Sequence, residues 1–167
     1  GWCMTSILKV TEIQDPTNSN TALTIDSSGR VSRPVIPYAF VTFPGTDTYV
    51  SKTANAIVDF SVAAVNDGNH YNTSTYKFTC PVAGLYTVEI STLSESSGQA
   101  HTWQIFRSTG GAETALGIIY TQSRASAGSM TIKCSANDDL YLKQLNNIKY
   151  YQSTTSPYNW ATYTFLG

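Results

Sequence analysis

The chain has 167 residues, enough for one domain that buries most of its apolar surface. Charged residues make up 13% of the sequence and the net charge is −1, so the basic surface needed to bind nucleic acid or an anionic membrane is missing. No apolar run approaches the roughly 20 residues of a membrane helix. We therefore expect neither nucleic acid nor a membrane among the partners of this chain.

Residues 1–35 are predicted to form a short extended arm. Strands are expected over residues 7–13 and 22–25, and the run Asp26-Ser27-Ser28-Gly29 has the composition of a turn. Two short strands cannot hold a hydrophobic core of their own. The arm is therefore expected to lie on another surface, either the chain's own domain, a neighbouring subunit or a larger assembly.

Residues 36–167 are predicted to form one all-β domain, an antiparallel sandwich or jelly roll. Aromatic residues make up 12% of the chain, a composition that favours strands. Tyr86, Val88 and Ile90 alternate with polar residues, which is the period of a strand with one buried face. Clusters of Gly, Ser, Asn and Asp separate further segments of this kind. Strands are expected at residues 38–43, 57–65, 76–79, 85–92, 101–107, 115–122, 130–134, 140–145 and 161–166.

The three cysteines form neither an even-numbered disulfide framework nor a CxxC zinc motif; they are Cys3, Cys80 and Cys134. We expect reduced thiols, with Cys80 and Cys134 buried as small apolar side chains at the ends of strands. The sequence leaves a Cys80–Cys134 disulfide open but offers no support for it.

The sequence contains no catalytic motif, and we predict that the chain is not an enzyme. His70 and His101 lie in no spacing typical of a catalytic or metal site, and we expect a solvated polar role for each. The adjacent carboxylates Asp138 and Asp139 are the candidate metal ligands. In a turn they could share Ca²⁺ with loop carbonyls, but this cation takes about six to eight oxygens and the set is incomplete. No other cofactor is expected.

Six residues between positions 60 and 86 recur at a fixed spacing: Phe60, Asn66, Tyr71, Phe78, Gly84 and Tyr86. This spacing resembles the signature of the C1q-like domain. The chain departs from the family pattern at Val88 and Ile90, where family members usually carry aromatics. The resemblance is dense over residues 60–90 and extends loosely over residues 36–167.

The resemblance implies a jelly roll of about ten antiparallel strands that assembles as a homotrimer, as C1q-like and tumour-necrosis-factor-like domains do. Closed rings join two different surfaces of each subunit, and aromatic side chains are common in such interfaces. The family places its axial contacts near the strands that hold Tyr86, Tyr163 and Phe165, which are therefore the candidate trimer contacts. Burial of all three within the subunit is the alternative.

The arm carries a second resemblance. Segments 8–14 and 22–31 are similar to N-terminal segments of structural proteins from tailed bacteriophages, particularly marine ones. Joined to a C1q-like domain, such an arm predicts a non-enzymatic virion protein, assembled in the host cytoplasm, whose residues 4–33 bind the major capsid protein or another virion protein. We favour a homotrimeric capsid decoration or cement protein, because the chain lacks the long repetitive shaft of a fibre.

Two alternatives stay open. The chain could be the trimeric receptor-binding head of a tail fibre or baseplate, with loops 94–98 and 154–158 contacting a host glycan or receptor. Tyr158 and Trp160 are then the candidate ligand contacts, although Trp160 also suits core packing. The other alternative is a secreted C1q-like recognition module. The lack of a leader, of a collagen-like stalk and of paired cysteines argues against a secreted module.

Overall fold

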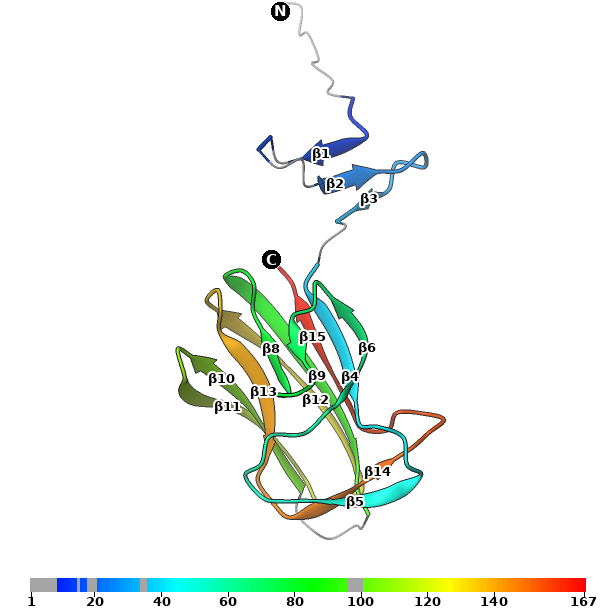
Figure 1. Ribbon diagram of the computed structural model, residues 1–167, viewed down its shortest axis with the longest axis vertical. Coiled ribbons are helices and arrows are strands. Elements are labelled where there is room, and N and C mark those ends of the chain that lie inside the picture. The colour runs from blue at the N-terminus through cyan, green and yellow to red at the C-terminus, as the bar shows by residue number, and fades with distance from the viewer. Residues whose placement is uncertain (1–8, 15, 18–20, 34–35, 96–100) are drawn as a thin grey trace, which may run out of the picture. The chain divides into compact units, whose positions relative to one another are not determined.

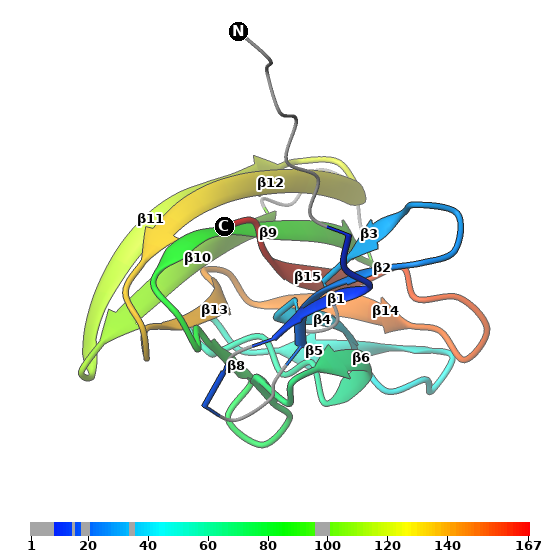
Figure 2. The ribbon, with the colours of Figure 1, turned by 90° about the horizontal axis from the view of Figure 1, so that it is seen from above.

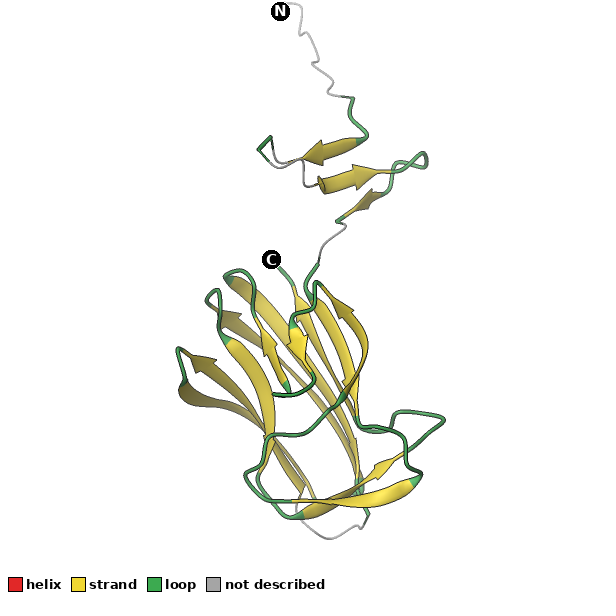
Figure 3. Cartoon of the chain, viewed as in Figure 1, coloured by secondary structure: helices red, strands yellow, loops and turns green. Residues whose placement is uncertain are grey.

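A computed structural model describes residues 9–14, 16–17, 21–33, 36–95 and 101–167 (Figure 1). The chain forms two compact units, Gly1–Ile36 and Pro37–Gly167. Every regular element of the described residues is a β-strand, and Figure 3 shows strands joined by loops, with no helix in this part of the chain. The all-β prediction is confirmed. Accordingly, the described residues include no helix that could span a membrane.

The first unit contains a small antiparallel sheet. Its three strands, with β2 in the middle, are β1 (Glu12–Gln14), β2 (Thr21–Ile25) and β3 (Val31–Ser32). Asp26 holds the predicted turn after β2, since its carboxylate accepts hydrogen bonds from the N–H groups of Ser28 (2.8 Å) and Arg30 (2.9 Å). No described residue of this unit is buried. The sheet therefore has no core of its own, as its short strands predict. Residues 7 and 8 of the predicted first strand lie outside the described residues.

The second unit contains the predicted jelly roll. Its strands are β4 (Tyr38–Thr42), β5 (Thr48–Lys52), β6 (Val62–Asp67), β7 (Tyr71–Asn72), β8 (Lys77–Thr79), β9 (Gly84–Leu93), β10 (His101–Thr109), β11 (Ala112–Thr121), β12 (Ala125–Cys134), β13 (Asp139–Gln144), β14 (Ile148–Gln152) and β15 (Trp160–Phe165).

Ten of these strands form two five-stranded antiparallel sheets, which confirms the prediction of about ten strands for the described part of the jelly roll. The β9 sheet has the strand order β12-β9-β15-β4-β6, and the β10 sheet has the order β11-β10-β13-β8-β7. β5 and β14 pair with each other and close the end of the sandwich opposite the C-terminus (Figure 1).

The two sheets face each other across an aromatic core. Phe78 on β8 stacks against Tyr163 on β15, with ring centroids 5.2 Å apart and 4° between the ring planes. Trp103 on β10 packs edge-on against Phe60, at 5.6 Å, and against Tyr150 on β14, at 5.1 Å. All five rings are at most 1% exposed. Burial of this aromatic surface is the main force that holds the sheets together.

The signature residues make their hydrogen bonds within the subunit. The Asn66 side chain closes the turn from β6 to β7, because it accepts from the Tyr71 N–H (3.0 Å) and donates to the Tyr71 carbonyl (2.9 Å). The Tyr71 hydroxyl donates to the carbonyl of Phe60 (3.0 Å). The Tyr86 hydroxyl donates to the carbonyl of Val82 (2.8 Å). The signature is thus explained by turns and core packing.

Gly84 is required where the C-terminal end of the chain crosses the start of β9. A Cβ atom at this position would lie 2.6 Å from the carbonyl oxygen of Gly167 and 2.6 Å from the ring of Phe165. The hydrogen bond from the Leu85 N–H to the Gly167 carbonyl (2.8 Å) fixes this close approach. Any larger residue must displace the C-terminal residues.

The predicted strand at residues 57–65 is wrong in its first half. Ile57 forms an isolated bridge with Lys143 of β13, whereas Val62 pairs with Thr42 of β4. The segment leaves the β10 sheet and enters the β9 sheet, so it cannot be one continuous strand. β5, β7 and β14 are absent from the predicted strands.

We predict that Gly84→Ala lowers the free energy of unfolding by roughly 1–3 kcal/mol, because the added methyl group overlaps Gly167 and Phe165. Urea unfolding at equal protein concentration measures the change. In a Phe165→Ala background one of the two overlapping groups is gone, and the cost of the added methyl group should fall. A Gly84→Ala chain within about 0.5 kcal/mol of the unsubstituted chain would contradict this packing.

Candidate interaction surfaces

The structure places two of the three predicted trimer contacts inside the subunit. Tyr86 and Tyr163 are 0% and 1% exposed and belong to the core, because the alternation of β9 and β15 directs them toward the β10 sheet. Phe165 is half-buried and packs against Tyr86, with 5.0 Å between ring centroids. Tyr86 and Tyr163 therefore present no surface to a second copy, and the alternative of burial within the subunit applies to them.

The outer face of the β10 sheet carries paired charges. Lys143 Nζ lies 2.6 Å from a carboxylate oxygen of Glu113. Lys77 Nζ lies 3.8 Å from a carboxylate oxygen of Asp139 and 4.7 Å from the ring centroid of Tyr141. The hydrogen bond from Lys143, and after it the one from Tyr141, lowers the pKa of Glu113. Charges paired in this way are compatible with contact with water.

The outer face of the β9 sheet carries an apolar cluster among polar side chains. Phe40 on β4 and Trp160 on β15 form an aromatic pair with 6.0 Å between ring centroids. Val62 and Val65 on β6 lie next to β4 and are 40% and 39% exposed. The Glu89 carboxylate on this face accepts a hydrogen bond from the Thr162 hydroxyl of β15 (3.1 Å). This face thus combines an aromatic pair and exposed valines with a hydrogen-bonded carboxylate.

A second apolar surface lies on β11, an end strand of the β10 sheet. Ile118 and Tyr120 of this strand are 57% and 59% exposed. β11 runs beside β12, an end strand of the β9 sheet, at one side of the sandwich (Figure 2). β11 and β12 approach closely because Gly117 has no side chain. A Cβ atom on Gly117 would lie 2.3 Å from the Met130 side chain.

Three tyrosines gather at the β5–β14 end of the second unit. Tyr151 of β14 packs against Tyr49 of β5, with 5.1 Å between ring centroids, and against Tyr158, at 5.9 Å. The Arg124 guanidinium donates a hydrogen bond to the Tyr49 hydroxyl. Tyr158 is 47% exposed. We call Tyr49, Tyr151, Tyr158 and Arg124 the tyrosine cluster.

The predicted ligand contacts Tyr158 and Trp160 belong to two different aromatic groups. Tyr158 lies in the tyrosine cluster, whereas the half-buried Trp160 lies on the outer face of the β9 sheet. Asp47 anchors the loop at residues 154–158, since its carboxylate accepts from the Thr154 N–H (2.8 Å), and the hydrogen bonds from Thr154 lower the pKa of Asp47. Residues 96–98 of the other predicted contact loop lie outside the described residues.

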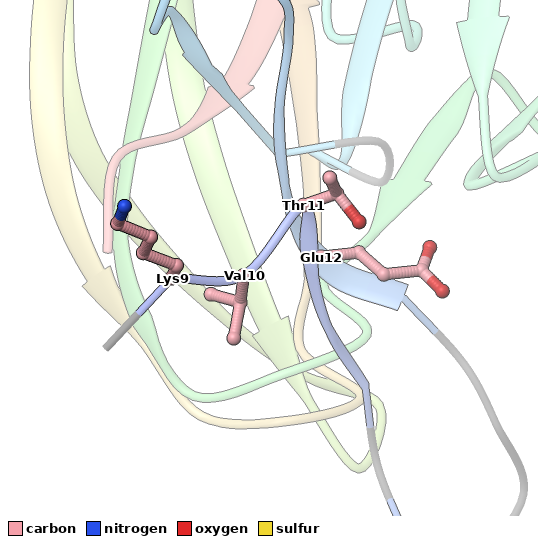
Figure 4. Close-up of a pocket in the computed structure, with 4 residues that line it drawn as sticks. All are labelled: Lys9, Val10, Thr11 and Glu12. Atoms are coloured by element: carbon pink, nitrogen blue, oxygen red, sulfur yellow. The ribbon is translucent and has the colours of Figure 1, made fainter. Parts of the chain in front are cut away.

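Two surface hollows carry mixed charge. The hollow beside β5 and β14 includes Lys149, whose Nζ is 3.0 Å from the Glu95 carboxylate, and Lys52, whose Nζ is 2.8 Å from that of Asp59. In the first unit a hollow lies along residues 9–12, and Figure 4 shows the Lys9 and Glu12 side chains there pointing apart. Because each hollow is lined by both positive and negative side chains, neither favours a ligand of one charge.

The two candidate metal ligands are engaged by protein donors. The Asp138 carboxylate is 2% exposed and accepts hydrogen bonds from the Thr109 hydroxyl (2.7 Å) and the Ser135 N–H (2.8 Å). The Asp139 carboxylate accepts from the Thr79 hydroxyl (2.7 Å). Within the described ranges, no three His, Cys, Asp or Glu side chains gather where they could hold a metal ion. In this structure Asp138 therefore stabilises a turn, and Asp139 takes part in a contact between two strands.

The prediction of a solvated role is wrong for His101. Its side chain is 3% exposed, and its Nε2 lies 3.0 Å from the Ser94 hydroxyl, because the first residue of β10 faces inward. His70 is half-buried and packs against Phe78, with 6.1 Å between ring centroids. Burial lowers the pKa of His70. The two histidines therefore take part in packing.

Comparisons with known proteins agree with this fold. Residues 39–167 match the model of the C1q domain. The Eiger TNF structure of S. frugiperda is 14% identical, with a TM-score of 0.66 over 81% of this chain and 94% of that one. Murine APRIL is 12% identical, with a TM-score of 0.61 over 78% and 99% of the two chains. The globular domain of zebrafish complement 1qA is 14% identical, with a TM-score of 0.54 over 78% and 96%.

A search of curated protein sequences finds no match to this chain. The structural similarities, at these identities, concern the fold, while the family model covers most of the second unit. The match covers the ten strands of the two large sheets, except Tyr38 at the start of β4, and all six signature residues from Phe60 to Tyr86, four of which belong to the buried core. The chain belongs to the C1q domain family.

Proposed function

We propose that this chain is a non-enzymatic assembly and binding module that works as a homotrimer. The observation that carries the proposal is the apolar cluster on the outer face of the β9 sheet, formed by Phe40, Trp160, Val62 and Val65. Exposed apolar surface of this kind is typical of a protein–protein interface.

A ring of three copies covers this face with a different surface of the next copy. In a closed ring each contact joins two unlike surfaces. The exposed Ile118 and Tyr120 of β11 supply a second apolar surface of suitable chemistry. Phe165, half-buried near the C-terminus, stays a candidate contact. Tyr86 and Tyr163 contribute only indirectly, because they hold β9 and β15 in place.

We predict that Val65→Asp raises the dissociation constant of the trimer by about 100-fold or more, because it places an unpaired carboxylate in the interface. Sedimentation velocity over a concentration series measures the shift. Val82→Asp makes the same change at a 45% exposed valine between β8 and β9, and it should leave association unaltered. Equal dissociation constants for the two variants would exclude the β9 face as the interface.

Within this class we propose a capsid decoration or cement protein of a tailed bacteriophage virion. β1 and β3 are the end strands of the first unit's sheet, so within the described residues each has an edge that can pair with another chain. The unit also has no buried residue among those described, which suits a segment that is stabilised by a partner. The partner would be the major capsid protein or another virion protein.

In purified particles we predict copies of this chain on the scale of the capsid lattice, counted by quantitative mass spectrometry against the major capsid protein. Particles that lack the chain should bind the full chain when it is added back. They should not bind a chain without residues 4–33, which should still fold and associate. Binding of the truncated chain would contradict the role of the first unit. Absence from particles would contradict the virion assignment and favour a secreted recognition module.

A second candidate function, receptor binding by a tail fibre or baseplate head, is favoured by the tyrosine cluster. Aromatic rings stack on the apolar faces of sugars, and a guanidinium donates hydrogen bonds to sugar hydroxyls or carboxylates. The cluster lies at the end of the sandwich opposite the C-terminus (Figure 1). A secreted recognition module could use the same surface for a glycan.

For this second function we predict that Tyr158→Ala weakens binding to purified bacterial lipopolysaccharide or capsular polysaccharide by at least about 10-fold, through loss of one stacking ring. Tyr158→Phe keeps the ring and should bind like the unsubstituted chain. Biolayer interferometry on immobilised polysaccharides measures both. If none of the polysaccharides binds the unsubstituted chain, or if Tyr158→Ala binds equally well, the tyrosine cluster is not a glycan site.

A further inference from the structure

Cys80 and Cys134 lie together in the core although they come from different sheets. Cys80 directly follows β8 of the β10 sheet, and Cys134 is the last residue of β12 in the β9 sheet. They are 0% and 3% exposed, as predicted, and both are free thiols. Both side chains belong to the same buried core cluster, and the hydrogen bond between the two thiols is the largest influence on the pKa of each.

Backbone hydrogen bonds hold the two cysteines in this arrangement. The Cys80 N–H donates to the Asp138 carbonyl (2.8 Å), and the Asn137 N–H donates to the Cys80 carbonyl (2.7 Å). The turn that contains these residues directly follows Cys134 and is closed by the Ser135 N–H, which donates to the Asp138 carboxylate (2.8 Å). The same turn therefore holds the Cys80 backbone beside the residues that follow Cys134.

The surroundings favour Cys134 as the first thiol to ionise. The hydrogen bond from Cys80 lowers the pKa of Cys134; burial and the Asp138 carboxylate oppose this effect, and the Arg107 guanidinium supports it. That hydrogen bond, together with burial, raises the pKa of Cys80. A thiolate that forms at Cys134 has a protonated thiol beside it, which is a starting point for thiol–disulfide exchange.

We propose that Cys80 and Cys134 form an inter-sheet disulfide when the protein is in an oxidising medium. The bond would join the end of β8 to the end of β12 and so tie the two sheets of the sandwich together. In a reducing compartment the same residues stay as two thiols that pack as small apolar side chains. The proposal depends neither on the trimer nor on the virion assignment.

The oxidant is a low-molecular-weight disulfide such as oxidised glutathione. The Cys134 thiolate attacks one sulfur of the oxidant, forms a mixed disulfide and releases one glutathione thiolate. The Cys80 thiol then loses its proton, and its sulfur attacks the Cys134 sulfur of the mixed disulfide and releases the second glutathione. Two protein thiols are oxidised, one oxidised glutathione is reduced to two molecules of glutathione, and the two thiol protons go to the products.

Refolding in glutathione redox buffers tests the proposal while both thiols are accessible. The full chain with Cys3→Ser is unfolded and then equilibrated at a series of reduced-to-oxidised glutathione ratios, with and without denaturant. Trapping of free thiols and mass spectrometry of peptides give the fraction that is Cys80–Cys134 linked. Folding and the disulfide stabilise each other by the same free energy. We therefore expect the equilibrium constant for forming the Cys80–Cys134 bond to be about 100-fold larger in the folded chain than in the unfolded chain.

Thermal unfolding gives an independent readout. Oxidised chain should unfold at a temperature higher by roughly 5–15 °C than reduced chain, whereas Cys80→Ala and Cys134→Ala chains should show no oxidant-dependent change. The proposal is overturned if the folded chain keeps two thiols under conditions that oxidise the unfolded chain. It is also overturned if the stable product is a glutathione adduct, or if the Cys80–Cys134 bond lowers the unfolding temperature.

Discussion

The stacking of Phe78 on Tyr163 is the contact on which the second unit depends. Phe78 belongs to the β10 sheet, and Tyr163 lies on β15, the middle strand of the β9 sheet, so this pair joins the two sheets at 5.2 Å. Because β15 is the last strand of the chain, the sandwich closes only when the C-terminal residues are in place. Gly167 lies against Gly84, where a side chain would leave no room for it. The side chains on the inner faces of both sheets are buried in this core. Contacts with partners therefore involve the outer faces of the sheets and the ends of the sandwich.

Different parts of the chain present outer surfaces that suit different kinds of contact. The paired charges of the β10 sheet suit contact with water, and the apolar side chains of the β9 sheet and β11 suit contact with further copies. The tyrosine cluster at the β5–β14 end suits a polar ligand such as a sugar. The first unit is a separate small sheet with strand edges. We propose that the chain assembles through one of these surfaces and binds partners through others.

The fold was largely predictable from the sequence, whereas the orientation of particular side chains was not. The spacing from Phe60 to Tyr86 marks the family because each of these residues has a packing or turn role that few other residues can fill. Tyr163 could be placed on a strand, but whether it faces inward depends on the register of β15 between its neighbours. β5 and β14 were not predicted because each is a short segment whose strand partner is the other, outside the two large sheets. The contact of Cys80 with Cys134 depends on the turn that links β12 to β13, which sequence spacing does not reveal.

We propose that another copy of the chain covers the outer face of the β9 sheet. Native mass spectrometry of the purified full chain at low micromolar concentration tests whether copies associate. We predict a single species with three times the 18.2 kDa mass of the chain, which persists on dilution. A species with the mass of one chain at that concentration would contradict the account, because the apolar face would then be stable in water without a partner.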